Sequence, residues 1–539
     1  MINGAEIIVK CLQKENTEVV FGYPGAAVLP LYNALTQSDI KNILVRFEQN
    51  AGHAASGYAR ISGKPGVCIA TSGPGATNLI TAIACAYMDS IPLVAITGQV
   101  RSDLLGRDVF QEVDITGACE PFTKHSYICM DTAQLPKIIK QAFHIASTGR
   151  KGPVLIDIPV DIQENELEDF CYEEKVEIAG YKPSVNGHLR QIKNAVLALE
   201  QAQRPVICAG GGAISSGAGD LIRTISLACD IPVVTTMMGQ SLMCNKDENY
   251  LGMLGNCGKK AANTAIKNAD VIMICGGRVG DRAVAAPDQV SKQATIIHID
   301  VDPAEIGKNL TTKIPIVGDL NCVLTAITEQ MPKVKHTKWL EQCKAQVTQT
   351  EYDEKDKGFV DPKLFINKLT SALEDNAVIV ADVGQNQIWA ADNSVFKCGT
   401  RFLTSGGLGA MGYSVPAAIG AKIADNSRQV VAICGDGAFQ MQMMELSTVV
   451  KTNSDIKIII MNNQCLGMVY ELQPQNSEFT KLSCNPDFTA LAKAYGINAK
   501  SITENSQIDA AIQWLMNTDG AAVLECAVDP TETSMGERE

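Results

Sequence analysis

The stretch AICGDGAFQMQ, at positions 432–442, is an apolar run that ends in Gly-Asp-Gly and continues into a segment of helical periodicity at 440–451. A second apolar run, IKIIIMNN, follows at positions 456–463. Strand, helix and strand in this order predict one right-handed βαβ unit, whose two parallel strands end at the same edge of a sheet. Asp436 and Asn463 are therefore expected to converge on one point.

Asp436 and Asn463 carry the oxygen ligands that a hard divalent cation prefers. A carboxylate, an amide oxygen and loop carbonyls suit Mg²⁺, which keeps phosphate oxygens and water as further ligands. Gly437 opens a helix, whose free N–H groups favour a phosphate. A turn aspartate and a loop asparagine are each common alone, but their coincidence at the ends of adjoining strands favours a metal and phosphate site.

Apolar runs alternate with helical patterns along the whole chain, which predicts parallel sheets covered by helices. The runs lie at 18–25, 42–49, 66–75, 92–98, 152–159, 204–212, 231–236, 270–277, 294–302, 377–385, 401–407, 429–437, 457–463 and 521–529. Polar stretches at 161–187 and 333–358 separate three groups of runs. The predicted fold class is α/β, with three consecutive doubly wound parallel-sheet domains at 1–165, 185–332 and 358–539.

The composition is that of a globular protein, with 46% hydrophobic and 19% charged residues among 539. This length predicts about three domains. The net charge of −13 and the lack of a Lys/Arg run argue against nucleic acid as a partner. No apolar run approaches the ~20 residues of a membrane span, and the start of the chain is unlike a signal peptide. The 18 scattered cysteines predict reduced thiols and a cytoplasmic protein.

The GDG motif, followed at this spacing by NN, resembles the signature of thiamine-diphosphate enzymes. The resemblance implies that Asp436, Asn463 and the backbone carbonyl of Cys465 bind the Mg²⁺ that holds the cofactor's diphosphate. It also implies a diphosphate-binding Gly-Gln turn in ADVGQNQIWAAD. The diphosphate residues implied in this way are Gly384, Gln385, Asn386, Gly435, Gly437 and Ala438.

The stretch VRFEQNAGHAASGYAR resembles the amino-terminal, pyrimidine-binding domain of the acetolactate synthase branch, and the resemblance extends over nearly the whole chain. Glu48 is placed at the end of an apolar strand, where partial desolvation favours a protonated carboxyl group. A bare glutamate at a strand end is most often a solvated cap, whereas the resemblance implies the acid that hydrogen-bonds the cofactor's pyrimidine and activates it. The loop residues that it places beside the cofactor are Tyr23, Pro24, Gly25, Ser72 and Asn78, with Gly25 approaching the reactive ring.

Three further segments resemble parts of the same family. DVFQEVDITGACEPFTKHSY implies that Phe110 faces the substrate channel, with Gln111 and Lys124 as catalytic residues. LTSGGLGAMGYSVPAAIGA implies that Met411 wedges between the cofactor's rings and that the Gly409 carbonyl accepts a hydrogen bond from the pyrimidine amine. NNQCLGMVYELQ adds Met468 to the cofactor contacts.

The substrate pocket matches the family in one residue and departs from it in another. Arg282 matches an arginine that pairs with a substrate carboxylate in a bidentate manner. Leu472 stands where the family usually has a Trp that grips the ethyl group of 2-ketobutyrate. Asn386 also replaces the usual His of the Gly-Gln-His turn, and the tail AVDPTETSMGERE lacks the family's closing segment.

The central domain resembles one that holds FAD without using it for redox chemistry. AGGGAISSG misses a strict G-x-G-x-x-G and is weak alone, but LGMLGNCG, GGRVGDRAV and HIDVDPAEIGKN strengthen it. The family usually has Phe-Asp where Val279-Gly280 stand. The flavin contacts implied by the resemblance are Arg150, Gly211, Gly212, Met253, Gly277, Arg278, Asp300 and Asp319.

These resemblances imply a large, catalytic subunit that decarboxylates pyruvate on thiamine diphosphate and joins the two-carbon unit to a second 2-keto acid, in branched-chain amino acid biosynthesis. They imply a homodimer, or a dimer of dimers, with each active site shared between subunits, and leave room for a small regulatory subunit. The alternative within the enzyme class is another thiamine-diphosphate-dependent 2-keto acid decarboxylase or carboligase with a different acceptor. A non-catalytic nucleotide-binding regulator is the alternative outside it, but a regulator needs neither Glu48 nor the metal pair.

Overall fold

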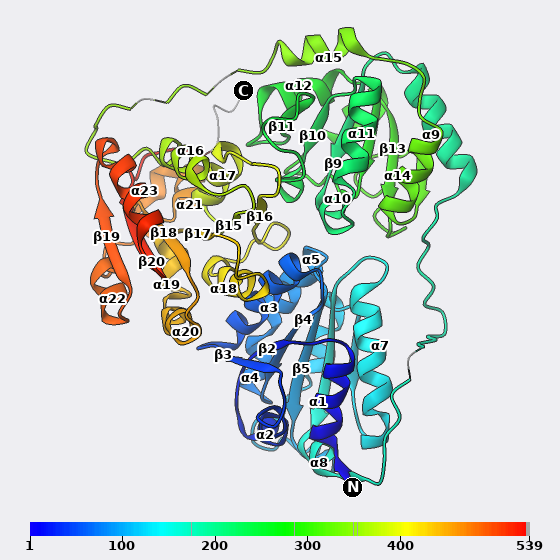
Figure 1. Ribbon diagram of the computed structural model, residues 1–539, viewed down its shortest axis with the longest axis vertical. Helices are drawn as coiled ribbons and strands as arrows, with labels where there is room; N and C mark the ends of the chain where they lie inside the picture. The colour runs from blue at the N-terminus through cyan, green and yellow to red at the C-terminus, as the bar shows by residue number, and fades with distance from the viewer. Residues whose placement is uncertain (174, 285, 349, 353, 535–539) are drawn as a thin grey trace.

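The computed structural model describes residues 1–173, 175–284, 286–348, 350–352 and 354–534. Three six-stranded sheets dominate the chain, and the strands within each sheet are parallel. Figure 1 shows one sheet in blue and cyan, one in green and one in yellow to red, so the three follow one another along the sequence. The predicted α/β class with three parallel-sheet domains is thus confirmed. No helix in the described ranges is long and apolar enough to cross a membrane.

The first and third sheets share one strand order. When the strands of each sheet are numbered in chain order, both sheets have the spatial order 2-1-3-4-6-5. The strands of the first sheet are β2 (Val19–Tyr23), β3 (Lys41–Leu44), β4 (Gly66–Ala70), β5 (Leu93–Gln99), β6 (His125–Ile128) and β7 (Pro153–Pro159). Those of the third are β15 (Val378–Ala381), β16 (Arg401–Leu403), β17 (Val430–Gly435), β18 (Ile456–Asn462), β19 (Asn498–Ile502) and β20 (Ala522–Ala527).

The central sheet has a different order: third, second, first, fourth, fifth, sixth. This is the order of dinucleotide-binding α/β domains. Its strands are β9 (Pro205–Ala209), β10 (Val233–Thr235), β11 (Tyr250–Met253), β12 (Val271–Cys275), β13 (Thr295–Asp300) and β14 (Ile314–Val317).

Helices cover both faces of each sheet, which explains the continuous apolar runs in the sequence. Every residue of β4, β5, β7, β9, β12 and β15 is buried. The helices of the first domain are α1 (Gly4–Lys14), α2 (Leu29–Leu35), α3 (Glu48–Ser62), α4 (Pro74–Asn78), α5 (Ile80–Met88), α6 (Ile115–Cys119), α7 (Leu135–Ser147) and α8 (Val160–Glu164). Those of the central domain are α9 (Leu189–Gln201), α10 (Gly211–Ser215), α11 (Gly219–Cys229), α12 (Lys260–Asn268), α13 (Pro287–Gln293), α14 (Leu320–Glu329) and α15 (Thr337–Lys344). The third domain has α16 (Pro362–Ala372), α17 (Gln385–Asn393), α18 (Ser414–Ala424), α19 (Asp436–Gln440), α20 (Leu446–Thr452), α21 (Gly467–Leu472), α22 (Phe488–Ala494) and α23 (Ile508–Asn517).

The sequence missed four strands of the three large sheets, namely β6, β11, β14 and β19. All four lie at sheet edges, and each contains residues that are exposed or only partly buried. A small antiparallel pair, β1 (Ile2–Asn3) with β8 (Glu166–Leu167), was also missed. The placement of Glu48 at a strand end was wrong, because β3 ends at Leu44 and Glu48 is the first residue of α3.

Helices α3 and α18 join the first domain to the third, and small residues let them approach closely. A side chain added at Gly57 would lie 2.0 Å from the Ala417 carbonyl oxygen, and one at Gly420 would lie 1.8 Å from that of Ala54. Only glycine therefore fits at these two crossing points. Backbone contact of this kind fixes how the two domains sit against each other.

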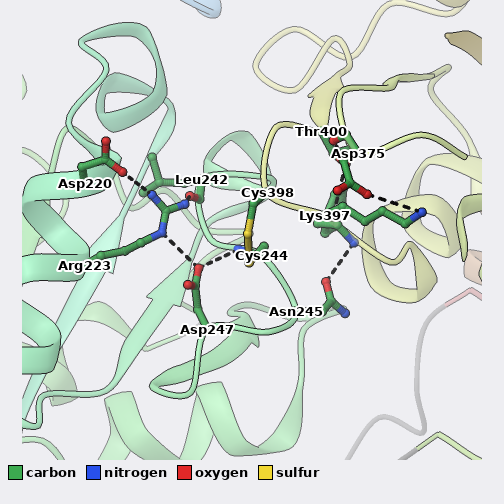
Figure 2. The surroundings of a disulfide bond; sticks show 11 residues. Asp220, Arg223, Leu242, Cys244, Asn245, Asp247, Asp375, Lys397, Cys398 and Thr400 are labelled. Atoms are coloured by element: carbon green, nitrogen blue, oxygen red, sulfur yellow. Dashed lines mark hydrogen bonds and ion pairs between the residues drawn. A yellow bond between two sulfur atoms is a disulfide. The ribbon is translucent and has the colours of Figure 1, made fainter. Parts of the chain in front are cut away.

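A disulfide joins the central domain to the third domain. Cys244 pairs with Cys398 across 154 residues of sequence, so the expectation that all cysteines are reduced was wrong for this pair. Figure 2 shows the disulfide beside Asn245. Asn245 N donates a hydrogen bond to the Phe396 carbonyl at 2.9 Å, and Phe396 N donates to Asn245 Oδ1 at 2.8 Å. No local pattern predicts this bond, because the two cysteines lie in different domains and 154 residues apart in the chain.

The disulfide leads to a prediction about thiol counts. Because two of the 18 cysteines are paired, we expect denatured, unreduced protein to titrate with 16 free thiols and reduced protein with 18. A Cys398→Ser variant should then titrate with 17 thiols in both conditions, since Cys244 loses its partner. The measurement is a thiol titration under denaturing conditions. Equal counts of 18 before and after reduction of the parent protein would contradict the pairing.

Candidate active site

Loops diverge in a doubly wound sheet at the gap where the strand order reverses, and ligands bind in the crevice that results. In the third sheet this gap lies between β15 and β17, and in the first sheet between β2 and β4. The sequence-predicted cofactor residues follow these strands at their carboxyl ends. Gln385 follows β15 and Asp436 follows β17, while Gly25 follows β2 and Ser72 follows β4. Each sheet thus carries one half of a candidate site.

The metal pair lies at the ends of two adjoining strands, as predicted. β17 and β18 are parallel, with Gly435 opposite Met461, so Asp436 and Asn463 lie just beyond the ends of two neighbouring strands. Asp436 is 1% exposed, and burial raises the pKa of its carboxyl group to about 6. No three His, Cys, Asp or Glu side chains cluster as a metal site anywhere in the described ranges. A cation here would rest on one carboxylate together with amide, carbonyl and ligand oxygens, which fits Mg²⁺ with a diphosphate.

Asn485 is a residue of this half-site that the sequence did not reveal. Its Nδ2 donates to Asp436 Oδ2 at 2.6 Å and contacts Asn462 Oδ1 at 3.2 Å. Gln440 Nε2 in turn donates to Asn485 Oδ1 at 2.8 Å. Asn485 comes from a loop between β18 and α22, more than 20 residues after the NN motif, so no local spacing pointed to it. It holds the orientation of the Asp436 carboxylate.

Gln385 is hydrogen-bonded to Asn463, one of the two predicted metal ligands. Asn463 Nδ2 donates to Gln385 Oε1 at 2.8 Å. Gln385 Nε2 donates to the Glu532 carbonyl at 2.7 Å and to Glu471 Oε1 at 2.5 Å. A side chain added at Gly467 would lie 1.8 Å from Gln385 Oε1. The structure therefore brings the predicted turn, the metal asparagine and the described part of the tail together.

Asn386 points into the sheet. It is 3% exposed, and its Nδ2 donates to the carbonyls of Asp382 at 2.8 Å and Ile433 at 3.2 Å. Both of its amide hydrogens are thus used to tie the end of β15 to the end of β17. Only Oδ1 remains to face the neighbouring glycines, since a side chain added at Gly384 would lie 2.7 Å from it.

Met411 lies close to Gly437, in the loop that carries Asp436. A side chain added at Gly437 would lie 3.5 Å from Met411 Cε. The bend that carries Met411 is fixed by Asp382, which is fully buried and accepts hydrogen bonds from Gly412 N at 3.0 Å and Ser414 N at 2.8 Å. Gly409, two residues before Met411, has φ +76°, a left-handed conformation that favours glycine.

The first domain brings Glu48 together with Asn78, one of its predicted loop residues. Asn78 Nδ2 donates to Glu48 Oε2 at 2.9 Å. A side chain added at Gly75 would lie 3.4 Å from Glu48 Oε1 and 2.7 Å from Thr71, and one at Gly25 would lie 2.5 Å from Thr71. Thr71, which the sequence analysis passed over, is therefore the contact that packs the two loops together.

Gln111 reaches the same edge of the sheet. Its Cα would lie 2.9 Å from a side chain added at Gly73, and both residues have positive φ, +60° and +56°. The neighbouring Phe110 is 88% exposed. Tyr23, at the end of β2, is 41% exposed. The half-site on the first domain is thus open, with apolar side chains at its rim.

Lys124 is not brought to this half-site. Its Nζ donates to the Thr148 carbonyl at 2.7 Å, to the Tyr181 hydroxyl at 3.0 Å and to the Ile145 carbonyl. It therefore caps the carboxyl end of α7, and none of its hydrogen bonds within the described chain reaches Gln111 or Glu48. Burial lowers the pKa of its amine to about 8.

Two charged residues from different domains act on the thiol of Cys257. Cys257, in the central domain, has a raised pKa because it is partly desolvated; Arg282 opposes this rise and Glu471 adds to it. Arg282 of the central domain and Glu471 of the third domain therefore flank the same group. Leu472, the next residue after Glu471, is 60% exposed. Arg282 and Leu472 thus belong to one region where the two domains meet.

The predicted flavin residues follow the strands of the central sheet at one edge. Gly211 and Gly212 follow β9, and Gly277 and Arg278 follow β12, at the gap where this sheet reverses its order. The other predicted residues at this edge are Met253 at the end of β11, Asp300 at the end of β13 and Asp319 after β14.

The Gly210–Gly212 turn forms a cradle that a side chain would fill. A side chain added at Gly210 would lie 2.4 Å from the Gly276 carbonyl oxygen, and one at Gly212 would lie 2.8 Å from Gly276 Cα. Burial raises the pKa of the Asp300 carboxyl group. Nearby, His298 Nδ1 is buried without a hydrogen-bond partner in the described structure. A close backbone turn, a partly buried acid and an unused polar atom fit a dinucleotide with hydroxyl groups.

Arg150 and Asp319 have other partners. Arg150 extends from the first domain and pairs with Asp302 at 3.2 Å and Glu305 at 2.7 Å, on the loop after β13. Asp319 caps α14, because its side chain accepts a hydrogen bond from Cys322 N at 3.2 Å. Arg150 therefore joins the first domain to the edge of the central sheet, and Asp319 has a structural role in addition to any contact with a ligand.

Comparisons with protein families match all three domains. The model described as "Thiamine pyrophosphate enzyme, N-terminal TPP binding domain" matches residues 2–118, the central-domain model matches 192–327, and the "C-terminal TPP binding domain" model matches 382–526. The matched ranges contain the metal pair, Glu48 and the glycine cradle.

Curated proteins match along nearly the whole chain. The "Probable acetolactate synthase large subunit" of Methanococcus aeolicus is 42% identical, covering 98% of this chain and 92% of its own length. The "Acetolactate synthase large subunit" of Corynebacterium glutamicum is 43% identical, over 95% of this chain and 84% of its own. The "Acetolactate synthase isozyme 2 large subunit" of Escherichia coli (strain K12) is 40% identical, over 98% and 96%.

The raised pKa of Asp436 predicts how the half-site responds to substitution and to pH. Asp436→Asn keeps the shape and the Asn485 contact but removes the charge, so Mg²⁺-dependent thiamine diphosphate binding should weaken about 30-fold or more, equivalent to roughly 2 kcal/mol. The apoprotein should melt no lower than the parent at pH 7, because burial disfavours the charged form of Asp436. In the parent, cofactor affinity should fall as pH is lowered through about 6, where the carboxylate takes up a proton.

Titration calorimetry of cofactor binding, with melting curves of the apoproteins, measures both effects. The control is Lys313→Gln, which changes an exposed residue of the central domain and leaves the contacts of Asp436 in place. An Asp436→Asn protein that binds the cofactor as tightly as the parent would contradict the assignment.

Proposed function

The chain belongs to the family of acetolactate synthase large subunits, which are thiamine pyrophosphate enzymes, and on this premise we propose that it decarboxylates pyruvate and joins the remaining two-carbon unit to a second 2-keto acid. The observation that carries the proposal is the pair of half-sites. One holds the buried Asp436 carboxylate after β17 and the Asn463 amide after β18, and the other holds Glu48 beside Asn78 and Gly75, which follow β4. Acid activation and a metal-held diphosphate are the two things that this cofactor needs from a protein.

Thiamine diphosphate supplies, when bound, a carbon centre that takes up the two-carbon unit left when pyruvate loses CO₂. We propose that Asp436, Asn463 and the Cys465 carbonyl bind Mg²⁺, and that Gln385 and the residues around Gly437 bind the diphosphate. Met411 supports the bend between the rings. The Asp382 contacts that fix the Met411 turn support this assignment, because a rigid bend can hold a ligand in one conformation without further ordering cost.

Glu48 is proposed as the acid that holds a proton toward the pyrimidine ring nitrogen. Its hydrogen bond to Asn78 and its packing against Gly75 restrict where the carboxyl group can point. Gly25 and Gln111 border the same edge and leave room for the reactive ring. Arg282 is proposed to bind the carboxylate of a 2-keto acid, and Leu472 to contact the acceptor.

The central domain is proposed to hold FAD without redox turnover. The dinucleotide-type strand order, the glycine cradle and the partly buried Asp300 support this proposal. The proposed domain limits are 1–165 for the pyrimidine domain, 185–332 for the FAD-type domain and 358–539 for the diphosphate domain. Each range contains one complete six-stranded sheet.

A second copy of the chain is proposed to complete each active site. Apolar side chains beside the two half-sites are exposed in the single chain, as expected where another surface covers them. They are Tyr23 at 41%, Leu408 at 46%, Met441 at 52%, Leu472 at 60% and Phe110 at 88%. Several relatives carry "large subunit" in their names, which supports a small subunit as a further partner.

The experiment that tests the function is product identification. Purified protein with pyruvate, thiamine diphosphate, Mg²⁺ and FAD should release CO₂ and form 2-acetolactate, separated by chromatography. Acetaldehyde as the only product would favour a simple 2-keto acid decarboxylase, and absence of CO₂ release would contradict the proposal.

Glu48 gives a prediction about the proton-transfer step. Glu48→Gln is nearly isosteric and should bind the cofactor with an affinity close to that of the parent. It should slow exchange of the cofactor's C2 proton with deuterium by ~10²-fold or more, as expected for the loss of an acid–base group. The readout is rapid-quench exchange followed by NMR. C2 exchange at the parent rate in this variant would remove Glu48 from the mechanism.

Leu472 gives a prediction about the acceptor. A Trp at this point offers a flat apolar face to an extra methyl group, and one methylene in such a pocket is worth ~1–3 kcal/mol, or roughly 10–200-fold in discrimination. Leu472 is smaller than Trp and lacks this flat face. The parent enzyme should therefore form mainly 2-acetolactate when pyruvate and 2-ketobutyrate compete at equal concentration. Leu472→Trp should shift the product ratio toward 2-aceto-2-hydroxybutyrate.

Leu472→Met is the matched control, because it keeps the volume and apolar character of the side chain and should leave the product ratio near that of the parent. Chromatography of both products measures the ratio. A strong preference of the parent for 2-ketobutyrate would show that another residue grips the ethyl group.

A further inference from the structure

Helix α3 starts at Glu48 without a cap from its own sequence. Phe47 occupies the N-cap position and makes no side-chain hydrogen bond there. The first N–H groups of a helix have no partner within the helix, so they need acceptors from elsewhere. The orientation of this first turn decides where the Glu48 side chain points.

Glu445, from the third domain, contacts the chain on both sides of Glu48. Its Oε1 accepts hydrogen bonds from Arg46 N at 2.8 Å and from Asn50 Nδ2 at 2.9 Å. These donors lie two residues before and two residues after Glu48. Glu445 is fully buried, and Asn50 is 1% exposed, so water does not compete for the bond between these two side chains.

The residues that follow Glu445 strengthen this contact. Ser447 Oγ accepts a hydrogen bond from Arg46 Nη2 at 2.6 Å, and Thr448 Oγ1 contacts the Leu44 carbonyl at 3.3 Å. Thr448 Oγ1 also donates to Glu445 Oε2, which fixes the rotamer of the carboxylate. Figure 1 shows α20, which these residues begin, beside β3, the strand that leads to α3.

We propose that Glu445 is a positioning residue for Glu48: it holds the first turn of α3 from the neighbouring domain and so sets the position of the acid. The inference rests on the proposed role of Glu48 in cofactor activation. Glu48 is held from its own domain by Asn78 and, through the backbone, from the third domain by Glu445. The third domain, which carries the metal half-site, thereby also orients the acid of the first domain.

Two substitutions at one position separate positioning from charge. Glu445→Gln keeps one oxygen for Arg46 N and Asn50, and its amide can donate to Thr448 Oγ1. Glu445→Ala leaves the Arg46 N–H and the Asn50 amide without this acceptor. Ser447→Ala, which removes only the contact with the Arg46 guanidinium, is the control at the same interface.

The first readout is hydrogen–deuterium exchange of the apoprotein, measured by mass spectrometry. Peptides covering 44–50 should exchange faster in Glu445→Ala than in the parent, whereas Glu445→Gln and Ser447→Ala should stay close to the parent. This readout needs no cofactor and no assigned activity.

The second readout is C2 proton exchange of bound thiamine diphosphate. Displacement of an acid by a fraction of an ångström to an ångström costs roughly 10- to 100-fold in rate, so Glu445→Ala should slow C2 exchange by about that factor. Its cofactor affinity should stay within about threefold of the parent, because the metal half-site is untouched, and Glu445→Gln should recover most of the rate. If Glu445→Ala does not fold, Asn50→Ala removes one of the two donors instead and should give a smaller loss in the same direction.

Parental C2 exchange in Glu445→Ala, or equal loss in the Gln and Ala variants, would overturn the inference. Failure of the proposed function would give a different result, because the parent protein itself would then form no 2-acetolactate. Hydrogen–deuterium exchange of the backbone at residues 44–50 would still report whether Glu445 holds the helix.

Discussion

The active site depends on one constraint, the reversal of strand order in a parallel sheet. Loops on either side of this gap leave the sheet in opposite directions, so a crevice forms there without any special loop sequence. In the third sheet the gap places Gln385 opposite Asp436, and in the first sheet it places Gly25 opposite Ser72. The same order in both sheets gives two crevices of one kind. The sequence then differs between them, with the proposed metal ligands in one and the proposed acid in the other.

Buried carboxylates hold the parts of the site together. Asp382 binds the backbone on both sides of Tyr413, and Asp89 accepts hydrogen bonds from Gly406 N and Gly407 N at 3.1 and 2.7 Å. The segment that carries Met411 is thus fixed from the first and third domains at once. A charge removed from water is costly unless hydrogen bonds satisfy it, and backbone N–H groups do so with fixed geometry. Such contacts order a loop more firmly than exposed ion pairs do.

The sequence predicted what local pattern and short-range topology determine. Asp436 and Asn463 converge because right-handed crossover leaves no other arrangement, and the fully buried strands appear as continuous apolar runs. Edge strands such as β6 and β19 were missed because their exposed faces interrupt the apolar pattern. Asn485, the Cys244–Cys398 bond and the capping role of Lys124 depend on contacts between segments far apart in the chain, which periodicity does not encode. Glu48 was assigned the right neighbours but the wrong element, since a helix can start directly after a short edge strand.

We propose that one metal half-site and one acid half-site, from two copies of the chain, form each active centre. The most direct test combines two variants that each damage a different half. Glu48→Gln and Asp436→Asn chains are co-expressed with different affinity tags, and the hybrid dimer is purified through both tags. One of its two centres then contains both substitutions and the other contains neither, so the hybrid should show about half of the parent's acetolactate-forming rate, although each variant alone is nearly inactive. A hybrid no more active than the single variants would contradict the account.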